Sequence, residues 1–183
     1  MLPPLIILDV QDAINQPVWD GKNNPNYLDA IERLLSAWRA RGANVFHVKH
    51  NEANPNSSYH TRGPWNAIQA RVAPRGDEPV IAKSQNCAFV DTGLHSVLQE
   101  LGAEQIILTG VVIHNSMDAT IRAGKALGYE ILLPEDATTA VPVNDRNGKT
   151  WPAQDVFDLS LAVLGSEYAQ VTSVDNVLKA FTG

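Results

Sequence analysis

Three residues far apart in this chain, Asp9, Lys83 and Ser116, supply a carboxylate, an amine and a hydroxyl. Asp9 lies in the run Leu5–Val10, which is otherwise apolar. A carboxylate buried there costs several kcal/mol of desolvation unless a partner compensates it. Beside a buried carboxylate, Lys83 would form an ion pair that perturbs both groups, and Ser116 could act as a nucleophile whose oxyanion backbone N–H groups would hold.

Each of the three residues also has a purely structural explanation. Asp9 could cap a helix or form an internal hydrogen bond. Lys83 follows the short apolar run Val80–Ala82, and a single lysine in that position is most often on the surface. Ser116 precedes a helical pattern, where a hydroxyl is usually an N-cap. No spacing rule links these positions, so the residues alone leave both explanations open.

Apolar runs that indicate strands alternate along the chain with segments of helical periodicity. The pattern predicts strands over 5–10, 45–48, 80–82, 105–112, 130–133 and 169–172, and helices over 27–41, 92–101, 116–127, 152–164 and 175–181. This order predicts an α/β fold: a mostly parallel sheet in a three-layer α/β/α arrangement with Rossmann-like topology. Ligands of such sheets bind at the carboxyl ends of the strands, where the three candidates stand. No repeat or linker divides the chain, so we predict that residues 1–183 form one domain.

Composition excludes several classes of protein. The formal net charge is −6 and no basic block occurs, which argues against a nucleic-acid partner. No apolar run has the roughly 18 residues that a membrane span needs, and no secretory signal precedes the first strand. The lone Cys87 cannot form an internal disulfide, which fits a cytoplasmic protein. There is no Gly-rich phosphate cradle and no metal-ligand spacing among the five histidines, so we expect no cofactor and no metal.

Several motifs resemble the isochorismatase-like family of cysteine hydrolases over nearly the whole chain. They are Leu-Asp-Val-Gln at 8–11, Lys83 followed by Cys-Ala-Phe at 87–89, Thr-Gly-Val-Val at 109–112, Asp-Ala-Thr at 118–120, Gly-Tyr-Glu-Ile at 128–131 and Glu-Asp-Ala-Thr-Thr at 135–139. The resemblance implies the same fold, a small-molecule substrate and a homodimer or homotetramer. It implies hydrolysis of a C–N bond in a small amide or ureide without a cofactor.

The resemblance also assigns roles to residues. The family's Asp, Lys and nucleophilic Cys match Asp9, Lys83 and Ser116. It further implies a cis peptide bond between Val111 and Val112, with the backbone N–H groups of Val112 and Ser116 forming an oxyanion hole.

Serine in place of cysteine is the main departure from the family. A nearby cation readily ionises a thiol but not an alcohol, and an Asp9 of ordinary acidity is a weak base. Because Asn115 and Met117 depart from the family as well, a natural variant is favoured over an engineered change. Such a variant could hydrolyse amides through Ser116, hydrolyse a vinyl ether of the isochorismate type without a nucleophile, or only bind a small molecule.

Residues outside the triad could shape the pocket. Trp19, which follows the first strand, and Asn115 are candidate pocket walls. The polar and aromatic loop Asn51–Trp65 is long enough to cover the pocket or to contact another subunit. Trp151 and Cys87 are weaker candidates, Cys87 as a displaced nucleophile, since a lone cysteine is usually a small buried apolar residue.

Overall fold

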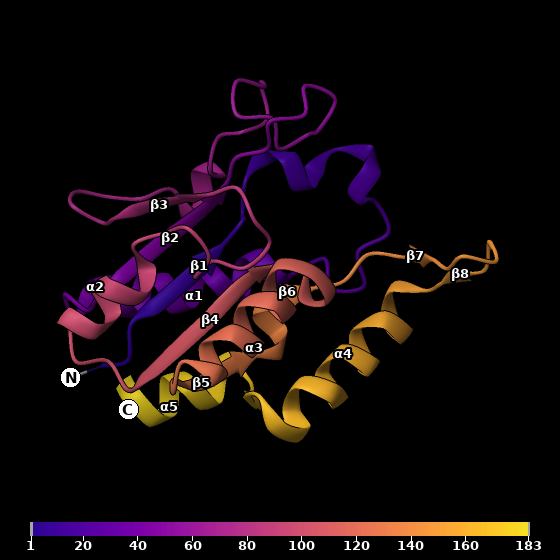
Figure 1. The fold of residues 1–183 in the computed structure, drawn as a ribbon. Coiled ribbons are helices and arrows are strands. Elements are labelled where there is room, and N and C mark those ends of the chain that lie inside the picture. Colours follow the sequence, from indigo (N-terminus) through magenta and orange to yellow (C-terminus); the bar gives the residue numbers. More distant parts are fainter. Residues whose placement is uncertain (1, 183) are drawn as a thin grey trace.

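A computed structural model describes residues 2–182 (Figure 1). Seven strands of this range form one sheet, in the order β3-β2-β1-β4-β5-β9, with β6 paired to β4; every pairing in it is parallel. The strands are β1 (Leu5–Leu8), β2 (Val45–His50), β3 (Val80–Lys83), β4 (Gln105–Val111), β5 (Glu130–Pro134), β6 (Thr138–Thr139) and β9 (Gln170–Thr172). The α-helices are α1 (Tyr27–Ala40), α2 (Leu94–Glu100), α3 (Asp118–Ala126), α4 (Ala153–Glu167) and α5 (Val174–Thr182).

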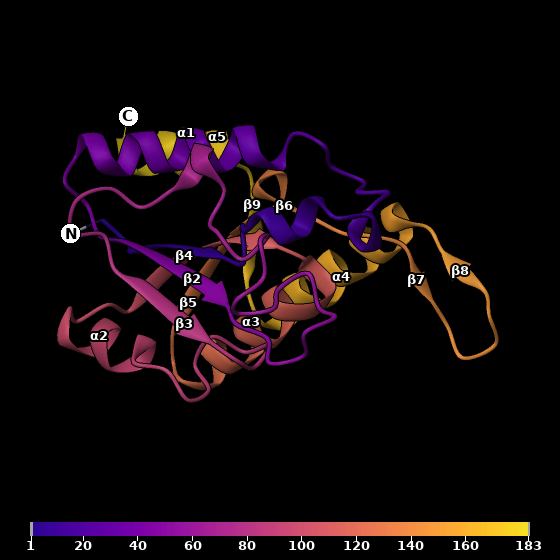
Figure 2. The same cartoon turned by 90° about the horizontal axis from the view of Figure 1, so that it is seen from above.

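Helices cover both faces of the sheet. Figure 2 shows α1 and α5 on one face and α2, α3 and α4 on the other. Within β1, Leu5 and Ile7 pack in the cluster with α1, whereas Ile6 and Leu8 pack in the cluster with α3. Because successive side chains of a strand point to opposite faces, burial on both faces requires an unbroken apolar run. The predicted three-layer α/β/α fold is confirmed.

The structure differs from the sequence prediction mainly at element ends. The helix predicted from residue 116 is preceded by a π-helical turn, Ile113–Met117, and α3 proper begins at Asp118. An antiparallel hairpin of β7 (Val143–Asn144) and β8 (Thr150–Trp151) projects from the body and was not predicted (Figure 1). Its two-residue strands are too short to produce a readable alternation.

The strand order reverses between β1 and β4, the two central strands. From β1 the chain adds β2 and β3 on one side, and from β4 it adds β5 and β9 on the other. The crossovers therefore leave in opposite directions, and a crevice forms at the carboxyl ends of these two strands. Asp9 follows β1 and Ser116 follows β4, so both stand at this crevice.

Gly110 allows β1 and β4 to approach one another. Its φ is +128°, and a Cβ atom built on it would lie 2.1 Å from the carbonyl oxygen of Leu8. That oxygen belongs to the backbone of the paired strand, which cannot move without breaking the sheet. Glycine is required at this position for both reasons.

We predict that Gly110→Ala destabilises the protein by at least about 3 kcal/mol, the sum of overpacking and backbone strain. Urea unfolding followed by circular dichroism measures the change. Gly93→Ala is the matched control, because a Cβ at Gly93 meets nothing within 4 Å. It should cost about 1 kcal/mol or less, through its N-cap position. Equal losses in the two variants would contradict this account.

Candidate active site

Four neighbouring strands each deliver one polar side chain to the crevice. His50 ends β2, Lys83 ends β3, Asp9 follows β1 and Ser116 lies in the π-helical turn after β4. Asp9, Lys83 and Ser116 are all buried. The structure thus brings together the three residues that the sequence analysis singled out.

Lys83 connects these groups. Its ammonium donates hydrogen bonds to Asp9 Oδ2 at 2.8 Å, to Ser116 Oγ at 3.3 Å and to the carbonyl of Gln85 at 3.1 Å. His50 Nδ1 lies 3.2 Å from the same nitrogen. Because the Lys83 side chain is fully buried, these contacts alone compensate the desolvation of its charge.

The backbone holds Asp9 in an unusual conformation. Its φ is +58°, a left-handed value that is uncommon for residues other than glycine. The Asp9 N–H donates to the Val48 carbonyl, and the Asp9 carbonyl accepts bonds from the Gln11 N–H and the Tyr59 hydroxyl. This turn ends β1 at Leu8 and aims the carboxylate along the sheet toward Lys83, so Asp9 is not a helix N-cap.

Burial raises the pKa of Asp9 above its ordinary value of 3.8, and attraction to Lys83 and a contact with the Ser116 hydroxyl oppose the rise. Its Oδ1 atom accepts no hydrogen bond of ordinary length from the residues described. A carboxylate with a raised pKa and an open oxygen is a better base than the ordinary Asp that the sequence analysis assumed.

Ser116 does not cap a helix. It lies inside the π-helical turn, no side-chain capping bond forms there, and Met117 occupies the N-cap position of α3. The N-cap explanation of this hydroxyl is therefore wrong. The peptide bond between Val111 and Val112 is cis, as the family resemblance implied.

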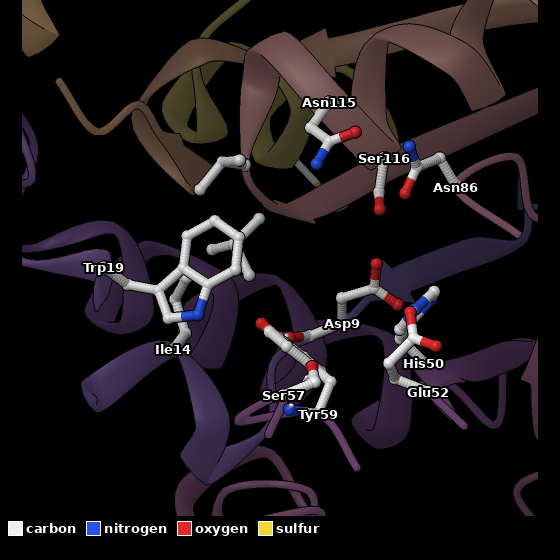
Figure 3. A pocket seen from close by; sticks show the side chains of 12 residues that line it. Asp9, Ile14, Trp19, His50, Glu52, Ser57, Tyr59, Asn86, Asn115 and Ser116 are labelled. Atoms are coloured by element: carbon white, nitrogen blue, oxygen red, sulfur yellow. Dashed lines mark hydrogen bonds and ion pairs between the residues drawn. The ribbon is translucent and has the colours of Figure 1, made fainter. Parts of the chain in front are cut away.

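A cavity of about 180 Å³ opens beside these residues. Its walls are Asp9, Ile14, Trp19, His50, Glu52, Ser57, Tyr59, Asn86, Val111, Val112, Asn115 and Ser116. In Figure 3 Trp19 and Ile14 lie on one side, His50 and Glu52 on the other, and Asp9 and Ser116 face each other between them. The two candidate pocket walls, Trp19 and Asn115, both line this cavity, and the loop Asn51–Trp65 contributes Glu52, Ser57 and Tyr59.

Sequence reasoning did not name Ile14, His50 or Asn86 as pocket residues, and within the loop Asn51–Trp65 it did not single out Glu52. His47 and His50 are three residues apart on β2, so their side chains point to opposite faces of the sheet. His47 contacts Glu78 Oε2 at 3.0 Å, whereas His50 faces the pocket. The sequence gives no sign of which face is the pocket, because that depends on where β1 and β3 lie beside β2.

Other candidates lie elsewhere. Cys87 and Trp151 are absent from the pocket wall, and Trp151 stacks under Lys149 on the projecting hairpin. Within residues 2–182 no group of three or more His, Cys, Asp or Glu side chains is arranged to hold a metal ion. The same range contains no helix with the length and apolar character that a membrane crossing demands.

Comparison with known proteins decides the family, because residues 3–157 match the isochorismatase domain. This chain belongs to the isochorismatase family. A crystal structure of an isochorismatase-family protein from Chromobacterium violaceum superimposes with a TM-score of 0.94 and 37% identity, over 98% of this chain and 93% of the other. YrdC of Bacillus subtilis, an isochorismatase family protein, is 30% identical over 97% of this chain and 95% of its own. Streptothricin hydrolase of Streptomyces noursei is 29% identical over 94% of this chain and 60% of its own.

The buried ion pair generates a stability prediction. Lys83→Met leaves the Asp9 carboxylate buried without its cation, so we expect a loss of about 3–5 kcal/mol at pH 7. Adding Asp9→Asn should recover much of that loss, since no buried charge then remains. Urea unfolding of the wild type, both single variants and the double variant gives the four free energies of unfolding of a double-mutant cycle.

The pH dependence of Lys83→Met has a definite sign. Without Lys83 the folded-state pKa of Asp9 rises further above 3.8, so its ionisation penalises folding at every pH above that folded-state value. The penalty disappears as the pH falls through the folded-state pKa toward 3.8. Relative to the wild type, Lys83→Met should therefore regain stability on acidification, and a deficit that stays constant with pH would contradict the assignment.

Proposed function

We propose that this isochorismatase-family protein hydrolyses the C–N bond of a small amide- or ureide-like substrate through Ser116. The observation that carries the proposal is the contact of one buried ammonium, that of Lys83, with both Asp9 and Ser116 at the wall of a small pocket. Relatives named as amidases support this reaction class. One is the N-carbamoylsarcosine amidase of Arthrobacter, which is 23% identical over 97% of this chain.

The proposed reaction has two steps. Ser116 Oγ attacks the carbonyl carbon while Asp9 takes the hydroxyl proton and passes it to the departing nitrogen, so that an acyl-serine ester forms and the amine leaves. Water then attacks the ester with Asp9 again as base, which releases the acid and restores Ser116. Lys83 stabilises, through its ammonium, the negative charge that develops on the Ser116 oxygen.

Backbone N–H groups complete the proposed site. Val112 and Ser116 both border the pocket, Val112 as the N-cap of the π-helical turn and Ser116 within it. The N–H groups of these residues would donate to the carbonyl oxygen as it becomes an oxyanion. Trp19 and Asn115 would contact the rest of the substrate.

Ammonia release from a panel of small amides and ureides tests the activity. Asp9→Asn and Ser116→Ala should each lower kcat by about 100-fold or more, because each removes a group that acts in the transition state. Ser166→Ala, which removes a hydroxyl from the exposed surface of α4, should leave the rate unchanged. Turnover that survives Asp9→Asn would refute the assigned roles, and turnover of isochorismate alone would favour vinyl-ether hydrolysis.

Ser116→Cys tests whether the hydroxyl limits the rate. A thiol ionises more readily than an alcohol beside a cation, so this variant should hydrolyse the same amides at least as fast as the wild type. Mass spectrometry of the quenched reaction should show the acyl group on residue 116. A binding protein with no catalytic site would gain no activity from the thiol.

Acidity should control the rate through Asp9. The base must be ionised, and its pKa lies above 3.8, so kcat/KM should fall as the pH decreases through a value higher than 3.8. A pH–rate profile on folded protein measures this limb. Burial and Lys83 lower the pKa of His50, so this histidine could also titrate on the acid side of neutrality. His50→Gln is therefore the control. If the limb disappears in His50→Gln, histidine rather than Asp9 produces it.

A further inference from the structure

The pocket wall has an excess of negative charge. It carries two carboxylates, Asp9 and Glu52, and among the described residues that line it there is no lysine or arginine. Lys83 does not line the pocket: its side chain is fully buried, and its ammonium donates a hydrogen bond to Asp9. Asp9 is thus neutralised by a partner within the site, whereas Glu52 is not.

Glu52 is held in place by its own turn. One carboxylate oxygen, Oε1, accepts hydrogen bonds from the backbone N–H groups of Ala53 at 2.8 Å and Asn54 at 3.2 Å. These bonds lower the pKa of Glu52, so the group is ionised at neutral pH. The side chain remains 40% exposed.

Among residues 2–182, the other oxygen of Glu52 forms no ion pair with a lysine or arginine. Oε2 lies 3.7 Å from His50 Nε2, beyond hydrogen-bond distance. Burial and the neighbouring Lys83 lower the pKa of His50, so this ring is neutral at neutral pH. Glu52 therefore borders the pocket with a carboxylate that no opposite charge from the described residues neutralises.

We propose that the substrate carries a cationic group, an ammonium or a guanidinium, which binds Glu52, and that amides bearing a carboxylate are disfavoured. This inference rests on the proposed function, since it takes the Ser116 pocket as the substrate site. Figure 3 shows Glu52 at the side of the pocket next to the facing pair Asp9 and Ser116. A short molecule bound through its cation can thus present its carbonyl to Ser116.

Three amides of nearly equal size test the charge preference: 4-aminobutanamide, pentanamide and succinamate, which are cationic, neutral and anionic at neutral pH. Their affinities are measured on Ser116→Ala protein, which cannot turn them over, by following tryptophan fluorescence or ligand NMR. The cation should bind about two- to fivefold more tightly than the neutral amide, and about tenfold more tightly than the anion. Added salt should reduce both ratios.

Glu52→Gln in the same background should remove the preference. Glutamine keeps an oxygen that can accept the two turn hydrogen bonds, so the loop should retain its shape while losing the charge. Glu100→Gln is the matched control, because Glu100 is exposed at the end of α2, just before β4 begins. It therefore lies near the amino-terminal ends of the strands, whereas the pocket lies at their carboxyl ends. The control variant removes the same charge and should leave the order of affinities intact.

Binding keeps this test separate from the proposed hydrolysis. Absence of ammonia release by the wild type would overturn the proposed function while the affinities still report on the charge of the site. Equal affinities, a preference for succinamate, or no saturable binding of 4-aminobutanamide would overturn the role of Glu52. So would a Glu52→Gln effect that weakens all three ligands equally, since that is what a purely structural role predicts.

Discussion

A single buried ion pair, Lys83 with Asp9, is the constraint on which the rest of this site depends. Two charges leave water only if each compensates the other, and here the compensation extends over strands that are not neighbours, because β2 lies between β1 and β3. The lysine side chain must pass the end of β2 to reach the carboxylate. Its ammonium therefore also contacts His50 and Ser116, and so connects side chains from the ends of four strands.

This arrangement explains how a serine can stand where the family resemblance implied a cysteine. A thiol needs mainly a cation, but an alcohol needs a base that takes its proton during attack. Burial raises the pKa of Asp9 and one of its oxygens is left open, while the neighbouring lysine still stabilises negative charge. The same desolvation that makes Asp9 costly to fold therefore supplies the basicity that the proposed reaction requires.

The sequence predicted the layers and most elements because those depend on patterns within short segments. Leu5–Leu8 is apolar throughout because both faces of β1 are covered, and this is visible without coordinates. The three triad positions came from family motifs. What could not be predicted were contacts that depend on strand order, such as His50 beside Lys83, and local backbone geometry, such as the π-helical turn around Ser116. The sequence placed the loop Asn51–Trp65 near the pocket but did not single out Glu52, because which of its side chains face the pocket depends on the folded path of the loop.

β3 has a further consequence for the durability of the site. It is an edge strand with one paired neighbour and largely exposed side chains, yet it carries Lys83, whose side chain is fully buried against Asp9. Edge strands open locally at a lower free energy than central ones. Fraying of these four residues would draw Lys83 away from Asp9 while the rest of the sheet stays intact, so chemical competence would be lost through a sub-global opening before the fold itself is lost.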